Sequence, residues 1–206
     1  TQWSSSAASD VYKRQKDNKL IMVGEKGHGN QSFPCSFDFR YYKDIYIVKT
    51  NLNGAALWQK THGNEYLEKG TDIVAKESGG YIIAGEKCDH GYNISSCDKR
   101  AKIILLEIDE DGNSNQETIL NNLYFFEAGS PISISNTSNG GYVFVSKPKN
   151  NGYTWFYKWG QNENSIDLKL ENAGYGGESI EMSNDGGFII GTSGSTIIKT
   201  DQELNF

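Results

Sequence analysis

The sequence predicts an all-β fold built from a repeated unit, and three observations lead to this prediction. A glycine pair followed by an apolar run occurs three times, as GGYIIAG from Gly79, GGYVFVS from Gly140 and GGFIIGT from Gly186. Short apolar or alternating runs are separated by Gly, Asn and Asp, which is typical of strands joined by turns. No stretch shows a sustained helical period. Self-similarity at a fixed spacing is typical of propellers and other repeat folds.

Each unit is predicted to contain four short antiparallel strands. The first strand includes an isoleucine six residues before each glycine pair: Ile73, Ile134 and Ile180. The glycine-pair strand comes second, and KLIMVGE (19–25) matches it without the glycines. The third strand is DIYIVKT (44–50) or KIILLEI (102–108), with weaker copies from Trp155 and Thr196. The fourth alternates, as in SIDLKLE (165–171). Asn53-Gly54 and Asp111-Gly112 predict type I′ hairpin turns.

The chain is predicted to hold parts of four such units within residues 16–206. The parts cover about 16–63, 69–120, 127–171 and 177–206. Residues 1–15 fit no unit, and SSAASDVYKRQ (Ser5–Gln15) resembles adapter-derived sequence. We therefore interpret residues 1–15 as a disordered, non-native scar, which leaves the natural N-terminus and any export signal outside the sequence.

The second and third strands of each unit are apolar at almost every position, and this favours a propeller over a two-sheet sandwich. A sandwich strand alternates, because one face of each sheet meets water. Runs such as Tyr81–Ala84 and Ile103–Leu106 need cover on both faces, since burying each such side chain is worth about 1.5–3 kcal/mol. The sequence therefore predicts a partial β-propeller, an arc of about four four-stranded blades that stack face to face.

The composition argues against a nucleic-acid partner and against a membrane-spanning segment. The chain has 206 residues, a formal net charge of −6 and no cluster of Lys and Arg. We expect no nucleic-acid partner, because a phosphate backbone requires a basic surface. No run approaches the roughly 18 consecutive apolar residues of a membrane span.

Residues 44–63, DIYIVKTNLNGAALWQKTHG, and 70–86, GTDIVAKESGGYIIAGE, carry a family resemblance. They resemble the blade repeats of bacterial, Bacteroidetes-like, cell-surface and secreted β-propeller proteins, with Trp58 at the place of the blade tryptophan. The resemblance extends from about residue 16 to the end and is loosest in the third unit. It implies a secreted or cell-surface, non-catalytic module that binds or displays a protein or carbohydrate ligand, without a cofactor, within a larger protein. The alternative is a glycan-active propeller enzyme with catalytic residues partly outside this chain.

Two long connections between second and third strands predict a contact surface. In both connections a histidine precedes a cysteine by seven residues, His28 before Cys35 and His90 before Cys97. Long insertions at one edge commonly carry binding residues. The candidate contact residues are His28, Phe33, Tyr41, His90 and Tyr92.

Cys88 and Cys97 are candidates for a disulfide within the second connection, which an exported protein would favour. Unpaired cysteines remain the main alternative. Zinc is a weaker one, because no CxxC or HxxxH knuckle is present, and no metal is assigned.

Other motifs are interpreted as structural. Residues 109–113, DEDGN, do not match the register of an EF-hand and predict a hairpin turn. Tyr153, Trp155, Tyr157 and Trp159 fall on one face of a strand. We expect them to pack between blades, because aromatic side chains bury large areas, with stacking on sugar rings as the alternative. No catalytic residues are predicted.

Overall fold

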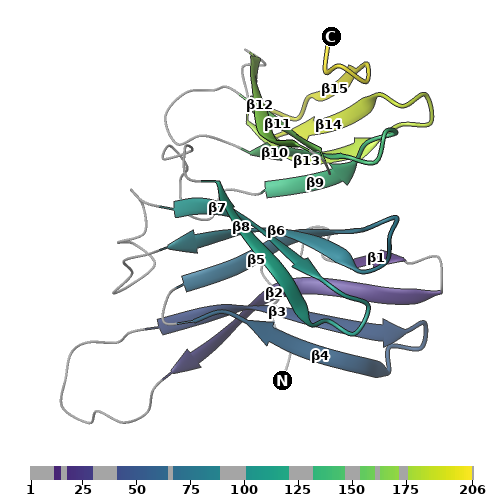
Figure 1. Cartoon of the computed structure of the whole chain (residues 1–206). Coiled ribbons are helices and arrows are strands. Elements are labelled where there is room, and N and C mark those ends of the chain that lie inside the picture. Colours follow the sequence, from purple (N-terminus) through teal and green to yellow (C-terminus); the bar gives the residue numbers. More distant parts are fainter. Residues whose placement is uncertain are drawn as a thin grey trace.

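The computed structural model describes residues 12–14, 18–29, 41–64, 67–88, 101–120, 132–146, 154–160, 163–171 and 176–205. Within these ranges every regular element is a β-strand, which confirms the all-β prediction (Figure 1). The strands are β1 (Tyr12–Arg14), β2 (Lys19–Gly29), β3 (Tyr41–Asn51), β4 (Ala56–His62), β5 (Leu67–Ala75), β6 (Tyr81–Cys88), β7 (Ala101–Ile108), β8 (Ser114–Leu120), β9 (Ile132–Asn136), β10 (Tyr142–Ser146), β11 (Thr154–Gly160), β12 (Glu163–Glu171), β13 (Gly177–Met182), β14 (Phe188–Thr192) and β15 (Ile197–Thr200).

Consecutive strands pair antiparallel in four meanders, which we number in chain order. Meander 1 is β1–β4, meander 2 is β5–β8, meander 3 is β9–β12 and meander 4 is β13–β15. Meanders 1 and 2 join into one eight-stranded sheet through a parallel pairing of Lys43 with Leu67. Meanders 3 and 4 are separate sheets, and none of the described sheets closes on itself.

Strand β1 lies in the segment that the sequence analysis places outside the fold. Its backbone pairs antiparallel with β2, Tyr12 opposite Met22 and Arg14 opposite Leu20. These three residues therefore belong to the sheet. The rest of residues 1–15 lies outside the described part of the chain, and their origin as a non-native scar stays a prediction.

The meanders stack face to face with an apolar layer between each neighbouring pair. Layer A lies between meanders 1 and 2 and contains Ile21, Val23, Ile45, Ile47, Ile73, Tyr81, Ile83, Ile104, Leu106 and Ile108. Layer B lies between meanders 2 and 3 and contains Val74, Ile82, Ala84, Ile103, Leu105, Leu120, Ile132, Ile134, Tyr142, Phe144 and Tyr157. Layer C lies between meanders 3 and 4 and contains Val143, Val145, Phe156, Ile180, Phe188, Ile190 and Leu204.

Alternate side chains of one strand enter opposite layers, which explains the continuous apolar runs. Tyr81 and Ile83 of β6 enter layer A, whereas Ile82 and Ala84 enter layer B. All residues of β6 are buried. The prediction that the second strand of meander 2 is covered on both faces is therefore confirmed.

The glycine pairs are required for two different reasons. The first glycine of each pair has a positive φ, such as +93° at Gly79 and +84° at Gly186. The second glycine lies against the neighbouring strand: a Cβ on Gly80 would lie 2.2 Å from the carbonyl oxygen of Ile108. A Cβ on Gly187 would lie 2.0 Å from the carbonyl oxygen of Thr200. The pair thus provides a left-handed turn residue and then a close backbone approach.

The Asn53-Gly54 and Asp111-Gly112 turns differ from the predicted type I′ form. Only the glycines have positive φ, +80° at Gly54 and +78° at Gly112. In the second turn the N–H of Gly112 donates to the carbonyl oxygen of Asp109 at 3.1 Å. The Asp109 carboxylate also accepts from the N–H of Asp111 at 2.9 Å. The turn is therefore a type I turn followed by a left-handed glycine, because the Asp109 side chain fixes the backbone locally.

Candidate functional site

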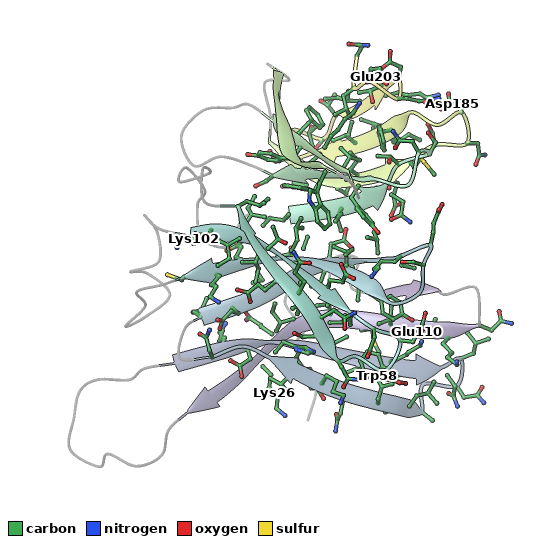
Figure 2. The ribbon with its side chains drawn as sticks, viewed as in Figure 1. Lys26, Trp58, Lys102, Glu110, Asp185 and Glu203 are labelled. Carbon is green, nitrogen blue, oxygen red and sulfur yellow. The ribbon has the colours of Figure 1, made fainter. Side chains whose placement is uncertain are left out.

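The two ends of the strands form two different edges of the stack. The turn edge carries the short turns that contain the glycine pairs and the short turns between the third and fourth strands. The long-connection edge is where β2 and β6 end and β3 and β7 begin, so the connections at 30–40 and 89–100 attach there. Figure 2 labels Trp58 and Glu110 at the turn edge and Lys102 at the opposite edge.

The structure describes only the backbones of two of the predicted contact residues. The backbones of His28 and Tyr41 lie near the end of β2 and at the start of β3, with Tyr41 opposite Gly29. Their side chains lie outside the described part, as do Phe33, His90 and Tyr92. A contact surface formed by these residues stays a prediction.

Cys88 is the last residue of β6, is fully buried and is disulfide-bonded. Its predicted partner, Cys97, lies outside the described residues. The pairing of Cys88 with Cys97 therefore stays a prediction. Among the residues that the structure describes, no group of three or more His, Cys, Asp or Glu is arranged to hold a metal ion.

Charged side chains lie close to Cys88 at the long-connection edge. Lys87 Nζ lies 2.9 Å from Glu117 Oε1 and 3.6 Å from Glu68 Oε1. Glu68 is 1% exposed, and this burial raises the pKa of its carboxyl group above the ordinary value despite the nearby Lys87. Burial alone would lower the pKa of Lys87, but the hydrogen bonds to Glu117 and Glu68 and the negative charges of these two residues together outweigh it, so the pKa is raised. A buried ion pair such as this restrains the edge without contributing much net stability.

The first strands of meanders 2, 3 and 4 are linked by side chains that accept hydrogen bonds from the next meander. The carboxylate of Asp72 accepts from the hydroxyl of Ser133 at 2.8 Å and from the N–H of Ile134 at 2.9 Å. The hydroxyl oxygen of Ser133 in turn accepts from the N–H of Ile180 at 3.2 Å. These bonds satisfy buried polar groups and fix each meander against the next. Sequence analysis missed this ladder, although Asp72 and Ser133 both directly precede the repeated isoleucine.

Glu110 in the β7–β8 turn connects meanders 1 and 2 at the turn edge (Figure 2). Its carboxylate accepts from Lys49 Nζ at 2.8 Å, from the N–H of Gly80 at 3.0 Å and from the hydroxyl of Tyr81 at 3.2 Å. Its carbonyl oxygen accepts from Trp58 Nε1 at 3.1 Å. The hydrogen bond with Lys49 is the main reason why the pKa of Glu110 lies below its ordinary value. The hydrogen bond of Trp58 thus links meander 1 to meander 2.

A pocket of about 210 Å³ lies at the turn edge between meanders 3 and 4. Its lining combines aromatic rings with polar side chains: Thr137, Ser138, Asn139, Gly141, Tyr142, Lys158, Trp159, Gly160, Gly186, Phe188, Gln202 and Glu203. Lys158 Nζ lies 2.8 Å from Glu203 Oε2, which links the two meanders across the pocket. Trp159 packs against Tyr142 with the ring centroids 5.5 Å apart. This turn-edge pocket is the candidate binding site.

The aromatic row of β11 has two roles. Tyr157 is fully buried and stacks on Phe144 with ring centroids 4.6 Å apart, which confirms the packing interpretation for this residue. Trp159 is half-buried, packs against layer B and also lines the turn-edge pocket. Tyr153 and the side chain of Trp155 lie outside the described part. Sequence reasoning identified the row, but it did not identify the pocket, because the opposite wall comes from meander 4.

Comparisons with known proteins assign no function. No family model matches the chain, and no curated protein matches it. A similar solved structure is that of a protein of unknown function from Bacteroides caccae, which is 12% identical with a TM-score of 0.48. The similarity covers 93% of this chain and 60% of that one, so the chain spans about 60% of the length of this neighbour. The comparisons therefore do not confirm the blade-repeat family that the sequence resembles.

Across the described residues, no helix has the length and apolar character needed to cross a membrane.

Proposed function

We propose that the chain is a partial β-propeller that acts as a non-catalytic, extracytoplasmic module for binding or display of a protein or glycan ligand. The face-to-face stacking of four meanders, with the first strands linked in series, supports a radial arrangement of blades. The disulfide at Cys88 supports secretion or the cell surface, because disulfides persist in oxidising compartments.

The turn-edge pocket is the observation that carries a binding function. Binding sites are concave and combine apolar or aromatic walls with a few polar groups that fix orientation. Here the half-buried Trp159 is the accessible aromatic residue of the lining, while Asn139, Gln202 and Lys158 provide hydrogen-bonding groups. Such a combination suits a sugar ring, which has an apolar face and a rim of hydroxyl groups. Within the proposal, glycan is therefore the favoured ligand class.

An enzymatic function has less support from this pocket. Most glycosidases use two carboxyl groups that flank the scissile bond. The pocket lining contains one, that of Glu203, and it is paired with Lys158. No specific observation favours the glycan-active enzyme.

A glycan array followed by calorimetric titration of the best-bound sugar tests the proposal. Gln202→Ala removes an exposed amide from the pocket, and we expect it to weaken binding by about tenfold, equivalent to about 1.4 kcal/mol. Gln116→Ala removes an exposed amide of β8 that lies outside the pocket lining, and it serves as the matched control. Equal affinity of the Gln202→Ala variant and wild type would place the ligand elsewhere, and absence of array binding would reject a glycan ligand.

The extracytoplasmic location has a separate test. Antibody labelling of intact source cells should detect the protein, or it should be found in the culture medium. Detection only after lysis would contradict this part of the proposal.

A further inference from the structure

Two junctions of the stack, one between meanders 1 and 2 and one between meanders 3 and 4, have a lysine at the same repeat position. We call them junction 1–2 and junction 3–4. Lys49 lies opposite Ile21 of β2, and Lys158 lies opposite Val143 of β10. Ile21 and Val143 are equivalent, because KLIMVG and GYVFVS occupy the same place in the repeat. The surroundings of the two lysines can therefore be compared directly.

The turns of the following meanders that contact these lysines are equivalent as well. They begin at Asp109 and Asp201, and each carboxylate accepts from the backbone N–H groups two and four residues later at 2.8–2.9 Å. Each aspartate N–H also donates to the carbonyl oxygen four residues later. The residue directly after the aspartate is Glu110 in meander 2 and Gln202 in meander 4. A carboxylate at junction 1–2 thus corresponds to an amide at junction 3–4.

At junction 1–2 the protein supplies the carboxylate that its lysine requires. The Glu110 carboxylate accepts from Lys49 Nζ at 2.8 Å, from the N–H of Gly80 at 3.0 Å and from the hydroxyl of Tyr81 at 3.2 Å. Lys49 is 3% exposed. A charge buried to this extent is costly unless it is paired, so the position of Glu110 is a carboxylate site.

At junction 3–4 two members of this arrangement are replaced. Gln202 stands in the place of Glu110, and Phe188, which has no hydroxyl group, stands in the place of Tyr81. Both replacing residues line the turn-edge pocket together with Lys158. The pocket thus contains the lysine of the carboxylate site, without the carboxylate that occupies this site at junction 1–2.

The ion pair that Lys158 does form is accessible to exchange. Lys158 Nζ lies 2.8 Å from Oε2 of Glu203, which Figure 2 labels, and the side chains are 30% and 75% exposed. An exposed pair of this kind contributes little stability, so the carboxylate of a ligand can replace that of Glu203 at small cost. The Gln202 amide can donate a hydrogen bond to such a ligand, whereas a glutamate there would repel it.

We propose that the turn-edge pocket selects glycans that carry a carboxylate, as uronic and sialic acids do, and that Lys158 binds this carboxylate. The inference rests on the proposed glycan-binding function and specifies the charge of its ligand. Trp159 packs against the sugar ring, and Gln202 donates an N–H to the ligand. Lys158 then forms with the ligand the ion pair that Lys49 forms with Glu110.

Calorimetric titration with matched sugars tests the proposal. The probes are trigalacturonic acid and 3′-sialyllactose, each compared with its own methyl ester, which keeps the sugar skeleton and removes the charge. At least one acid should bind about tenfold or more tightly than its ester. This preference should decrease as the NaCl concentration rises from about 50 to about 500 mM, because salt screens the attraction to Lys158.

Variants of the pocket assign the preference to its residues. Lys158→Gln should weaken binding of the acid about tenfold and leave that of the ester nearly unchanged. Glu203→Gln removes the competing carboxylate and should strengthen binding of the acid about two- to fivefold. Gln202→Glu restores the carboxylate of junction 1–2 and should weaken binding of the acid about tenfold. Lys60→Gln is the matched control, because it removes the same charge at the turn edge of junction 1–2, where Lys60 contacts the β7–β8 turn.

Circular dichroism identical to that of wild type shows that each variant is folded. Equal affinity for acid and ester would overturn the inference and leave glycan binding itself intact. Binding of neither acid would also overturn it, and the glycan array then shows whether glycan binding fails as a whole. A preference that survives Lys158→Gln, or that Lys60→Gln reduces equally, would contradict the role of Lys158. Equally tight, Lys158-dependent binding of tetra-aspartate would show that the pocket recognises acidic peptides instead.

Discussion

Meanders 2 and 4 contain almost the same phrase, GGYIIAG and GGFIIGT, yet they meet different surroundings. In β6 of meander 2 every residue is buried, because meanders 1 and 3 cover the two faces. In β14 of meander 4 burial alternates, with Ile190 fully buried and Ile189 44% exposed. Figure 1 shows the reason: meander 2 lies inside the stack and meander 4 at its end.

The comparison shows that an apolar repeat position provides a side chain suited to an interface between sheets. Whether that side chain is buried depends on the presence of a neighbouring sheet. The same apolar position contributes a large hydrophobic stabilisation when a neighbouring sheet is present and little when the face meets water. Stability in such arrays is approximately a sum of unit terms and nearest-neighbour terms. The end units should therefore tolerate substitutions that the inner units do not.

The largest expected difference is between Ile82→Ala and Ile189→Ala, which change the same repeat position. Ile82 is 1% exposed in layer B, and its truncation should lower the free energy of unfolding by about 2–5 kcal/mol. Ile189→Ala should change it by no more than about 0.5 kcal/mol, because the side chain is 44% exposed. Urea unfolding followed by tryptophan fluorescence measures both. Equal losses would show that another part of the folded chain covers Ile189.

The hydrogen bonds of Ser133 extend the comparison to a second repeat position, the residue directly before the isoleucine of each first strand. Ser133→Ala removes the acceptor for the N–H of Ile180 and a donor to Asp72, and should cost about 1–3 kcal/mol. Ser179→Ala, at the equivalent position of meander 4, should cost no more than about 0.5 kcal/mol because its side chain is exposed. Amide hydrogen exchange at Ile180 should accelerate in the first variant only. Unchanged protection in the Ser133→Ala variant would contradict the ladder.

The smallest expected effect concerns Glu68 at the long-connection edge, and it depends on pH. Burial raises its folded-state pKa above the value of about 4.3 in an unfolded chain. The protonated form is thus favoured in the fold, so this contribution to stability is fully present below pH 4.3 or so and is lost as pH rises through the folded pKa.

Glu68→Gln imitates the protonated form and should stabilise the protein at pH 7 but not at pH 3. Urea titrations at both values measure the difference, and Glu117→Gln is the matched control on the more exposed partner of Lys87. Destabilisation of the Glu68→Gln variant at pH 7 would mean that the ion pair with Lys87 outweighs burial.

Much of the fold is readable from the sequence because its signals are local. Strand positions follow from short apolar runs, and the glycine pairs mark the turns before them. Two local details were still wrong or incomplete. The turns at Gly54 and Gly112 are type I with a left-handed glycine, because a preceding Asn or Asp side chain binds the backbone. The second glycine is needed for a contact across strands, as at Gly80 with Ile108.

The candidate site was less predictable, since its walls come from distant segments. Asn139, Trp159 and Gln202 belong to two meanders, and no spacing in the sequence relates them. The aromatic row of β11 was visible as a pattern, but only the position of meander 4 decided that Trp159 lines a pocket while Tyr157 is enclosed in layer B.

The sequence by itself determined the repeat unit: which residues form strands, where the chain turns, and that both faces of the inner strands require cover. Backbone conformation and side-chain alternation set these features over a few residues. The tertiary structure alone decided which faces are covered, which polar groups meet across meanders and where a pocket opens. These features depend on which sheet packs against each meander, and the similar sequences around Ile82 and Ile189 do not specify that neighbouring sheet.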